Sequence, residues 1–578
     1  MTKISSLLFF LIISITTMAQ SVNYELGMED PHKHYFQVKM IISGFEGNDC
    51  LVKMPVWTPG SYKIREYGRY VENVTARIDD QFIAVEKQNK NSWLIKNEGS
   101  ESFVIEYEIY AFQENIRMSF LDESHAFVTG TTVFMYVDGQ KELQGEVLIK
   151  PWKEFTKIST SLPSAGENKF SYTNYDHLVD CPIEIGNQTI LSYNDHGVEY
   201  EIAMYGEANY KEKKLIEDMK KITAEATKVF GQNPNDRYVF IVHNTQSRGG
   251  GIEHSNSTVL QINRDSYEPE AQYERFLGLV AHEYFHVWNV KRIRAEAMGP
   301  FNYDSEIYTD LLWLFEGFTS YYDKLLMFRA GYKTRDEFLN AMLGTLRAVE
   351  SQPGNQVQSL RESSLDTWVK AYITDENSIN TTISYYSKGS LVAMLLDLEI
   401  AASSDGKKNL DDFMRRLYVR AEAGAKPISY RDVVEVASEV CGKDMSKKFM
   451  TWVERPGTLD YNSSMSQNGL KLSIFDTSKL SLGIGVGSNA YVSYVLRNSP
   501  AEQAGIYAGD ILLSINSQPL SEMDLAEVME NEQQKDSWKV ILIRKGVQKT
   551  VRMQKPKFDT FQIDLEITNE ELVNNWLN

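Results

Sequence analysis

Residues 278–294 read GLVAHEYFHVWNVKRIR and place two histidines and one glutamate in a mostly apolar stretch. On an α-helix, side chains four positions apart lie on one face, so His282 and His286 can bind one metal ion. Glu283 projects to the side of that face, where it can accept a proton from a water molecule on the metal. Burial of three polar side chains would be costly without a partner, and a metal supplies one. The alternative is a chance pattern on a solvated helix face.

A second segment, DLLWLFEGFTSYYDKLL (310–326), supports the metal site. Glu316 is the only acid between Asp310 and Asp323, in a run otherwise rich in Leu, Trp, Phe and Tyr. An unpaired carboxylate buried there would be unfavourable or would take up a proton. As a third ligand it completes a two-histidine, one-glutamate zinc site with an open fourth position. The sequence therefore predicts one zinc ion per chain, with a structural salt bridge as the alternative role for Glu316.

The periodicity of the chain changes twice, which predicts a multidomain α+β protein. A chain of 578 residues exceeds what one core usually holds. Short alternating runs over 20–205 predict an all-β, sandwich-like domain. Helical spacing prevails over 206–460, starting with an amphipathic helix at 208–231 that ends at Gly231. Residues 468–558 are β-rich again, and 559–578 form an acidic tail of undetermined order.

The first 19 residues, MTKISSLLFFLIISITTMA, have the organisation of a signal peptide. Lys3 provides the positive charge, an apolar run extends to Ile15, and small residues precede a cleavage site after Ala19. We therefore expect export, to the periplasm or to the medium, with an uncleaved anchor as the alternative. After cleavage, no apolar run is long enough to span a bilayer.

The formal charge and the cysteine count narrow the class of protein further. A net charge of −19 without a basic stripe argues against nonspecific binding to nucleic acid or anionic lipid. Three cysteines in an exported chain cannot form a disulfide framework. Cys50 and Cys181 could pair, or could be core thiols like Cys441.

Three motifs together resemble a known family. HEYFH followed by WLFEGFT resembles the Glu-zincin metallopeptidases, and WNVKRIR after the second histidine resembles the glycyl aminopeptidase family. MPVWTPGSYKIREYGRYVENV (54–74) is similar to the N-terminal domain of that family. The spacing from His286 to Glu316 is longer than in the aminopeptidase N group and matches the glycyl group. The resemblance implies a thermolysin-like, mainly helical zinc peptidase domain and a preference for small N-terminal residues such as Gly or Ala.

The same resemblance implies a substrate-binding strand at RGGGIEHS (248–255). Gly250, Gly251 and Ile252 would form the backbone edge that pairs with substrate, because glycine permits close backbone approach. Glu253 would hold the free ammonium group of the substrate. The alternative is a hinge loop with an exposed acid, and His254 is either a cleft or a surface residue.

SYYSKGSLV (384–392) resembles the segment that carries the oxyanion donor in these peptidases. Tyr386 occupies the matching position, and a phenol aimed at developing negative charge is what carbonyl hydrolysis requires. Tyr385 could take the role instead, and either tyrosine could be core packing. The roles of Lys291, Arg292 and Arg294, which follow the second histidine, stay open.

The segment SLGIGV (481–486) and the following SPAEQAGIYAGDILLSINSQPL are typical of a PDZ domain. The loop at Leu482, Gly483 and Ile484 would offer backbone N–H groups to a C-terminal carboxylate, and a strand edge would accept an extended peptide. The alternative is a β-rich cap that only packs on the peptidase.

These features predict an exported zinc aminopeptidase acting on peptides with free N-termini. Glu283 would activate the water, Tyr386 would stabilise the oxyanion and Glu253 would fix the amine. Two other functions fit the same residues. One is a zinc endopeptidase that recruits polypeptides through its PDZ domain, and the other is a noncatalytic peptide-binding protein.

Overall fold

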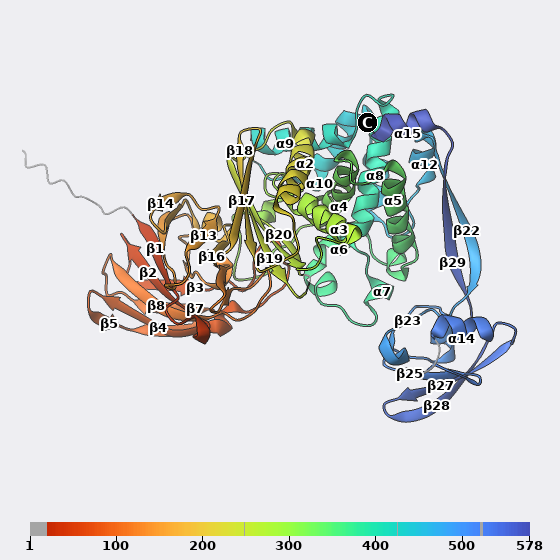
Figure 1. Ribbon diagram of the computed structural model, residues 1–578, viewed down its shortest axis with the longest axis horizontal. Helices are drawn as coiled ribbons and strands as arrows, with labels where there is room; N and C mark the ends of the chain where they lie inside the picture. The colour runs from red at the N-terminus through yellow and green to blue at the C-terminus, as the bar shows by residue number, and fades with distance from the viewer. Residues whose placement is uncertain (1–19, 248, 425, 521–523, 578) are drawn as a thin grey trace, which may run out of the picture. The chain divides into compact units, whose positions relative to one another are not determined.

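The computed structural model describes residues 20–247, 249–424, 426–520 and 524–577 (Figure 1). The predicted signal peptide, 1–19, lies outside the described residues. The chain divides into two compact units. The first unit extends to Thr58 and resumes over Arg65–Gln188, and the second comprises Pro59–Ile64 and Thr189–Asn578. Six residues from the N-terminal part of the chain therefore belong to the second unit.

The first unit is built from three β-sheets, which confirms the predicted β-rich N-terminal domain. Its largest sheet has the order β14-β15-β12-β1-β2-β8-β4-β5, and the other two are β13-β16-β10-β9 and β11-β3-β7-β6. β2 and β8 pair antiparallel, and alternate residues of each are buried, so one face of the sheet covers the core. The bounds are β1 Ser21–Gly27, η1 Pro31–Lys33, β2 Tyr35–Ser43, β3 Asp49–Lys53, η2 Tyr67–Tyr70, β4 Val71–Ile78, β5 Gln81–Ile83, β6 Val85–Asn89, β7 Ser92–Lys96, β8 Phe103–Tyr110, β9 Phe120–Leu121, β10 His125–Val128, η3 Gly130–Thr132, β11 Tyr136–Val137, β12 Gly145–Lys150, β13 Lys157–Thr160, β14 Ser164–Gly166, β15 Lys169–Tyr172, α1 Tyr175–Val179 and β16 Ile183–Gly186.

The second unit begins with a five-stranded sheet of order β17-β18-β19-β21-β20. Its strands are β17 Thr189–Asp195, β18 Val198–Tyr205, β19 Arg237–Thr245, β20 Gly250–Glu253 and β21 Ser257–Asn263. α2 (Glu212–Phe230) connects the parallel strands β18 and β19, and it ends at Gly231 in the left-handed conformation, as expected. The predicted boundary at 205 differs from the structure, because β18 pairs with β19 and β17 pairs with β18, so both strands belong to the peptidase sheet. Strand alternation looks the same on either side of such a boundary, so sequence periodicity could not locate it.

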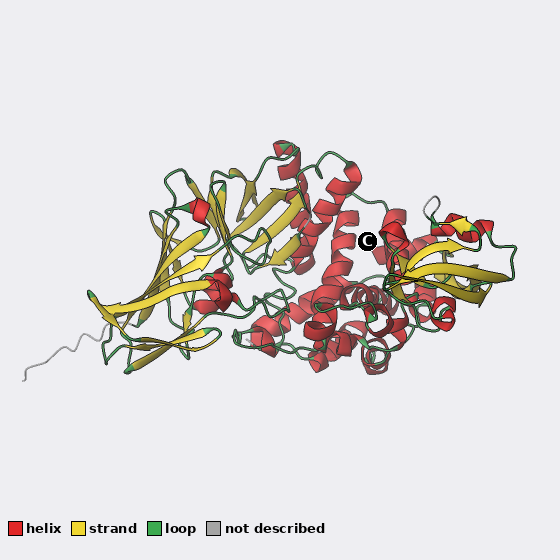
Figure 2. Ribbon diagram, turned by 90° about the horizontal axis from the view of Figure 1, so that it is seen from below, coloured by secondary structure: helices red, strands yellow, loops and turns green. Residues whose placement is uncertain are grey.

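Three helices form the centre of the second unit: α3 (Glu270–Phe285), α4 (Leu312–Arg329) and α8 (Tyr385–Ser403). α4 packs against both α3 and α8. Gly317 of α4 and Gly389 of α8 face each other so closely that a Cβ on either would overlap the other helix. This close crossing brings the first turn of α8 beside the middle of α4. The other helices, red in Figure 2, are η4 Glu296–Met298, α5 Arg335–Glu350, η5 Pro353–Gln356, α6 Leu360–Leu365, the π-helical turn η6 Thr367–Ala371, α7 Ser378–Thr381, α9 Leu410–Gly424, α10 Tyr430–Cys441, α11 Ser446–Phe449, η7 Met450–Glu454, α12 Asn462–Met465 and η8 Ser466–Asn468.

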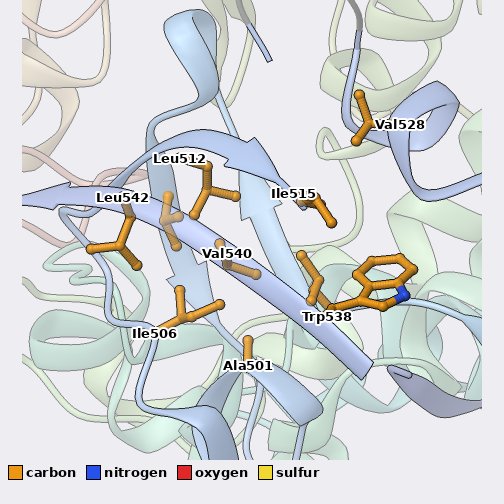
Figure 3. Close-up of a cluster of buried hydrophobic side chains, with 10 residues drawn as sticks. Ala501, Ile506, Leu512, Ile515, Val528, Trp538, Val540 and Leu542 are labelled. Atoms are coloured by element: carbon orange, nitrogen blue, oxygen red, sulfur yellow. The ribbon is translucent and has the colours of Figure 1, made fainter. Parts of the chain in front are cut away.

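The C-terminal part contains the predicted PDZ domain, whose small core is shown in Figure 3. Trp538 and Val540 of one strand pack there with Leu512 and Ile515 of its neighbour. A two-stranded ribbon, β22 with β29, connects this domain to the helices. The elements are β22 Leu470–Leu480, β23 Ile484–Val486, η9 Ser488–Ala490, β24 Val492–Val495, α13 Pro500–Ala504, β25 Ile511–Ile515, β26 Gln518–Pro519, α14 Leu525–Asn531, β27 Ser537–Arg544, β28 Val547–Gln554 and β29 Lys557–Ile567.

The predicted acidic tail, 559–578, is instead part of β29 and the helix α15 (Glu570–Leu577). Trp576 is 2 % exposed, and its indole N–H donates to Asp397 of α8 at 3.0 Å. The C-terminal segment is acidic, but burial of its apolar side chains is favourable and holds it against the helices of the second unit.

Two sequence expectations concern the whole chain. None of the helices in the described residues is both long and apolar enough to cross a membrane. Cys50, Cys181 and Cys441 are buried, and these described cysteines form no disulfide.

Candidate metal centre and peptidase site

The side chains of His282, His286 and Glu316 converge as the sequence predicts. The Nε2 atoms of both histidines, on the last turn of α3, lie 3.4 Å from Oε2 of Glu316 on α4. Glu316 is 5 % exposed and His286 is 1 % exposed, so the cluster is buried. One potential ligand atom from each residue lies within 4.8 Å of the others, which is the spacing a single ion requires.

The orientation of each imidazole is fixed by its other nitrogen. Nδ1 of His282 lies 3.2 Å from Oδ2 of Asp323, and Nδ1 of His286 lies 2.7 Å from the carbonyl oxygen of Asn289. In these positions Nδ1–H donates, so in the neutral imidazole each Nε2 would offer its lone pair to a metal ion beside Glu316. Sequence reasoning missed Asp323, although its position two helical turns beyond Glu316 on α4 is a signal that could have found it.

Asn289 is the second residue that sequence reasoning missed. Its amide donates to the carbonyl oxygens of Leu314 and Phe315 and to Oγ1 of Thr319, each at 3.1 Å. The end of α3 is thereby held to α4, and with it the spacing between the histidines and Glu316. This role accounts for the asparagine within WNVKRIR.

Electrostatics of the cluster fit a cation. Burial alone would lower the pKa of His282, but the neighbouring carboxylates of Asp323 and Glu316 raise it to about 10. Burial opposes ionisation of Glu316, yet the two imidazoles lower its pKa below the usual range. Oε2 of Glu316 is also buried without a partner of hydrogen-bonding geometry in the described residues. A divalent ion would satisfy that oxygen and replace the positive charge otherwise borne by the imidazoles.

Glu283 lies beside the predicted ligands and contacts β20 at Gly251. It is 5 % exposed, and burial raises the pKa of its carboxyl to about 7 against the lowering effect of His282 and His286. A Cβ built on Gly251 would overlap the Glu283 carboxylate. Only glycine therefore lets β20 approach α3 this closely.

β20 is the terminal strand of its sheet, with Gly251 opposite Leu260 and Glu253 opposite Thr258 of β21. Glu253 is 7 % exposed, and a carboxylate oxygen of this residue lies within 4.8 Å of ligand atoms of Glu283 and His286. The alternative of a hinge loop with an exposed acid is wrong: the segment is the strand β20, in which Ile252 and Glu253 are buried, and His254 next to it is buried as well. The structure brings together Gly250, Gly251, Ile252 and Glu253 at the metal helix.

The neighbouring tyrosines of α8 differ in their surroundings. The ring of Tyr386 lies 6.3 Å from that of His282 in a stacked arrangement and is half-buried. The hydroxyl of Tyr385 instead lies 3.0 Å from Oγ1 of Thr367, and its side chain is 2 % exposed. Tyr386 is therefore the tyrosine beside the metal cluster.

A cleft of about 510 Å³ lies between the start of β20 and the first three turns of α3, and of the predicted site residues only Gly250 lines it. Gly250 lines one wall, and Phe276 and Leu279, which precede Glu283 on α3, line another.

Arg292, whose role the sequence left open, is not among the residues that line this cleft. It donates to the carbonyl oxygen of Ser255 at 2.7 Å and to Oδ1 of Asn235 at 2.8 Å, and so holds the turn after β20.

The predicted PDZ residues differ in what they contribute. The side chain of Leu482 belongs to the buried core, at 1 % exposure. Gly483 has a φ of 70°, and a Cβ there would overlap Ser499, so glycine is required for this turn. Ile484 begins β23 and pairs with Val495 of β24. The turn and strand of a PDZ peptide site are present, whereas a ligand at this site stays a prediction.

Comparisons with known proteins agree with this geometry. Family models match at 23–187 (Peptidase M61 N-terminal domain), 275–392 (M61 glycyl aminopeptidase) and 491–534 (PDZ domain). A search of curated proteins returned no significant match.

A solved structure shares the fold of this chain over nearly its whole length. An aminopeptidase N family protein from Idiomarina loihiensis is 26 % identical, with a TM-score of 0.90, over 96 % of this chain and 100 % of that one. An M1 zinc metallopeptidase variant from Deinococcus radiodurans bound to Tyr-Ser-Ala is 13 % identical, with a TM-score of 0.48, over 76 % of this chain and 94 % of that one. That second likeness is too low to support an argument. The two peptidase matches, which span the N-terminal domain and the helices of the candidate metal cluster, show that the chain is a metallopeptidase and that it is similar to the M61 glycyl aminopeptidase family over these two regions.

Proposed function

We propose that this chain is an exported aminopeptidase that uses one zinc ion, bound by His282, His286 and Glu316, to remove small N-terminal residues from peptides. The observation that carries the proposal is the position of Glu253. Its carboxylate lies within 4.8 Å of Glu283 and His286. In a peptide, the amino nitrogen and carbonyl carbon of the first residue are about 2.5 Å apart. An ammonium group held by Glu253 therefore leaves room for a single residue before the scissile bond.

Each residue of the site has a role that follows from its position. A zinc ion at this cluster would act as a Lewis acid and lower the pKa of a water molecule. Glu283 accepts the proton of the attacking water and delivers it to the leaving amine. Tyr386 donates a hydrogen bond to the carbonyl oxygen as negative charge develops on it. The backbone of β20 pairs with the substrate, whose remaining residues lie in the cleft beside Gly250 and Leu279.

Hydrolysis of aminoacyl reporters, free and N-acetylated, with and without chelator, tests this function. We expect cleavage of free glycyl and alanyl reporters, loss of activity with chelator, and recovery when zinc is restored. N-acetylation should reduce kcat/KM at least about tenfold, because the ammonium partner of Glu253 is lost. Equal cleavage of acetylated peptides would support an endopeptidase instead. Absence of hydrolysis in zinc-loaded protein would support the noncatalytic alternative.

For the PDZ domain we propose a peptide ligand that ends in a free carboxylate. The turn at Gly483 and the strand β23 supply the backbone such a ligand requires. Binding of a library of C-terminal peptides, free and amidated, tests it. A ligand that binds equally well after amidation would contradict carboxylate recognition.

A further inference from the structure

The segment Pro59–Ile64, within the motif MPVWTPGSYKIREYGRYVENV, has no role in the function proposed above. It lies far in sequence from the rest of the second unit, yet its contacts place it there. Residues immediately before and after it belong to the first unit. A short segment that leaves its own domain to pack elsewhere must be stabilised by what it contacts.

Gly60 contacts the proposed amine anchor. Its φ is 81°, in the left-handed region, and a Cβ there would lie 2.8 and 3.0 Å from the two carboxylate oxygens of Glu253. The Gly60 backbone therefore covers Glu253 at van der Waals distance. A side chain at this position would both strain the turn and displace the carboxylate.

Tyr62, two residues further on, is packed among aromatic rings. Its ring meets Trp368 edge-on at 5.6 Å and Tyr372 at 6.1 Å, and its side chain is 5 % exposed. Trp368 is itself fixed, because its indole N–H donates to the carbonyl oxygen of Ile307 at 2.7 Å. These three residues form what we call the aromatic wall.

The aromatic wall lies at the catalytic site. Burial raises the pKa of Tyr62, and the charges of Glu253 and then Glu316 raise it further, so the phenol is close to both carboxylates. Tyr62 follows Gly60 by two residues, and Gly60 contacts Glu253, so the wall lies beside the proposed amine anchor.

We infer that Pro59–Ile64 closes the subsite that binds the N-terminal residue of the substrate. In this subsite Tyr62 is the specificity-determining residue, and Gly60 holds the carboxylate of Glu253 in position. This inference rests on the proposed aminopeptidase function. With its ammonium on Glu253 and its carbonyl at the metal cluster, a substrate residue has its side chain directed toward a wall of fixed rings. Hydrogen or a methyl group is accommodated, whereas a larger side chain collides with Tyr62.

The test compares Tyr62→Ala with the wild-type chain on glycyl, alanyl, leucyl and phenylalanyl reporters. A single methylene in a closed pocket changes discrimination by about 10–200-fold. We therefore expect the leucyl-to-glycyl ratio of kcat/KM to rise at least about tenfold in Tyr62→Ala. Phe82→Ala, which removes an exposed ring of the first unit, is the matched control and should leave the ratio unchanged.

Binding supplies a second readout that does not depend on turnover. Calorimetry with glycinamide and phenylalaninamide should show tighter binding of the larger ligand only in Tyr62→Ala. Gly60→Ala should weaken both ligands, because the new methyl group displaces Glu253. Circular dichroism and thermal melting identify a variant that has failed to fold, in which case the milder Tyr62→Leu replaces it.

These measurements distinguish a failure of the inference about Tyr62 from a failure of the proposed aminopeptidase function. If the wild-type chain cleaves free glycyl reporters and Tyr62→Ala or Tyr62→Leu keeps the same ratio, the inference about Tyr62 is overturned and the aminopeptidase function stands. A wild-type chain that cleaves acetylated substrates equally well overturns the function itself. A uniform fall in kcat/KM for every reporter would show that Tyr62 supports the fold and does not select substrates.

Discussion

The metal-binding half of the site comes from two neighbouring helices, whereas the substrate-binding half comes from a strand and a loop distant in sequence. His282, His286 and Glu316 reach one point because helical spacing on α3 and a close contact with α4 place them there. Glu253 and Gly60 meet although almost two hundred positions of chain separate them. Local periodicity determines the first half, and long-range packing determines the second.

The two halves also differ in how they tolerate change. In the metal half, each imidazole is held through Nδ1 by a separate partner, Asp323 or the carbonyl of Asn289. In the substrate half, close backbone approaches at Gly60 and Gly251 position the carboxylates of Glu253 and Glu283. We therefore expect mutations in the metal half to change metal content, and mutations in the substrate half to change selectivity while the metal stays bound.

Glu316→Ala should have the largest effect. Loss of a direct ligand should reduce metal affinity by more than the about 10–100-fold that loss of an outer partner costs, and activity should vanish without added zinc. Metal analysis of the purified protein measures this. Glu350→Ala, which removes another buried carboxylate of the second unit, should keep its metal. A full metal content in Glu316→Ala would remove this residue from the ligand set.

Glu283→Gln tests the residue at the junction of the two halves. We expect kcat to fall about 10²–10⁴-fold while metal content stays unchanged, because the general base is lost and no ligand is. Parallel measurement of kcat and zinc stoichiometry checks both statements. Loss of zinc in this variant would identify Glu283 as a ligand and contradict the role assigned to it.

Tyr386→Phe should lower kcat about 10²–10³-fold, since it removes one donor to the developing oxyanion. KM should change little, because the donor acts mainly in the transition state. Tyr385→Phe is the matched control: it removes a hydroxyl that contacts Thr367, and only stability should fall, by about 1 kcal/mol. Equal kinetic effects of the two substitutions would mean that Tyr386 has no special role.

Glu253→Gln should lower kcat/KM on free-amine reporters about 10–100-fold, which corresponds to losing a hydrogen bond to a charged group. The kcat/KM for acetylated reporters should change much less, so the ratio of kcat/KM between free-amine and acetylated reporters should fall. Metal content should remain that of the wild type. If discrimination persists in Glu253→Gln, another group holds the amine.

Asp323→Asn should have the smallest effect on turnover. The bond to Nδ1 of His282 weakens, so zinc affinity should fall about 10–100-fold, while activity at saturating zinc stays close to the wild type. Competition with a chelator measures the affinity. Lys324→Ala, which removes the cation 3.0 Å from Asp323 and keeps the bond to His282, should change affinity less. An unchanged affinity in Asp323→Asn would show that the carboxylate does not orient His282.

The domain boundaries show where sequence reasoning ends. Helix α2 ends at Gly231 as expected, because a left-handed glycine is a local signal. β17 and β18 belong to the peptidase sheet because of the strand they pair with, and alternation carries no information about a partner. The C-terminal segment contains part of β29 and the packed helix α15 for the same reason: Trp576 is buried and donates to Asp397 of α8, far away in sequence.

The sequence alone was sufficient for the convergence of the three candidate metal ligands, for the neighbouring Glu283 and for the order of β, helical and PDZ regions. These features depend on helical spacing, on the cost of an isolated buried carboxylate and on alternation along strands, all of which act over short separations. Only the tertiary structure decided that Tyr386 and not Tyr385 lies beside His282, and that Gly60 covers Glu253. Those contacts join segments whose separation in the chain carries no periodic signal, so they exist only once the helices, the sheet and the loop have packed.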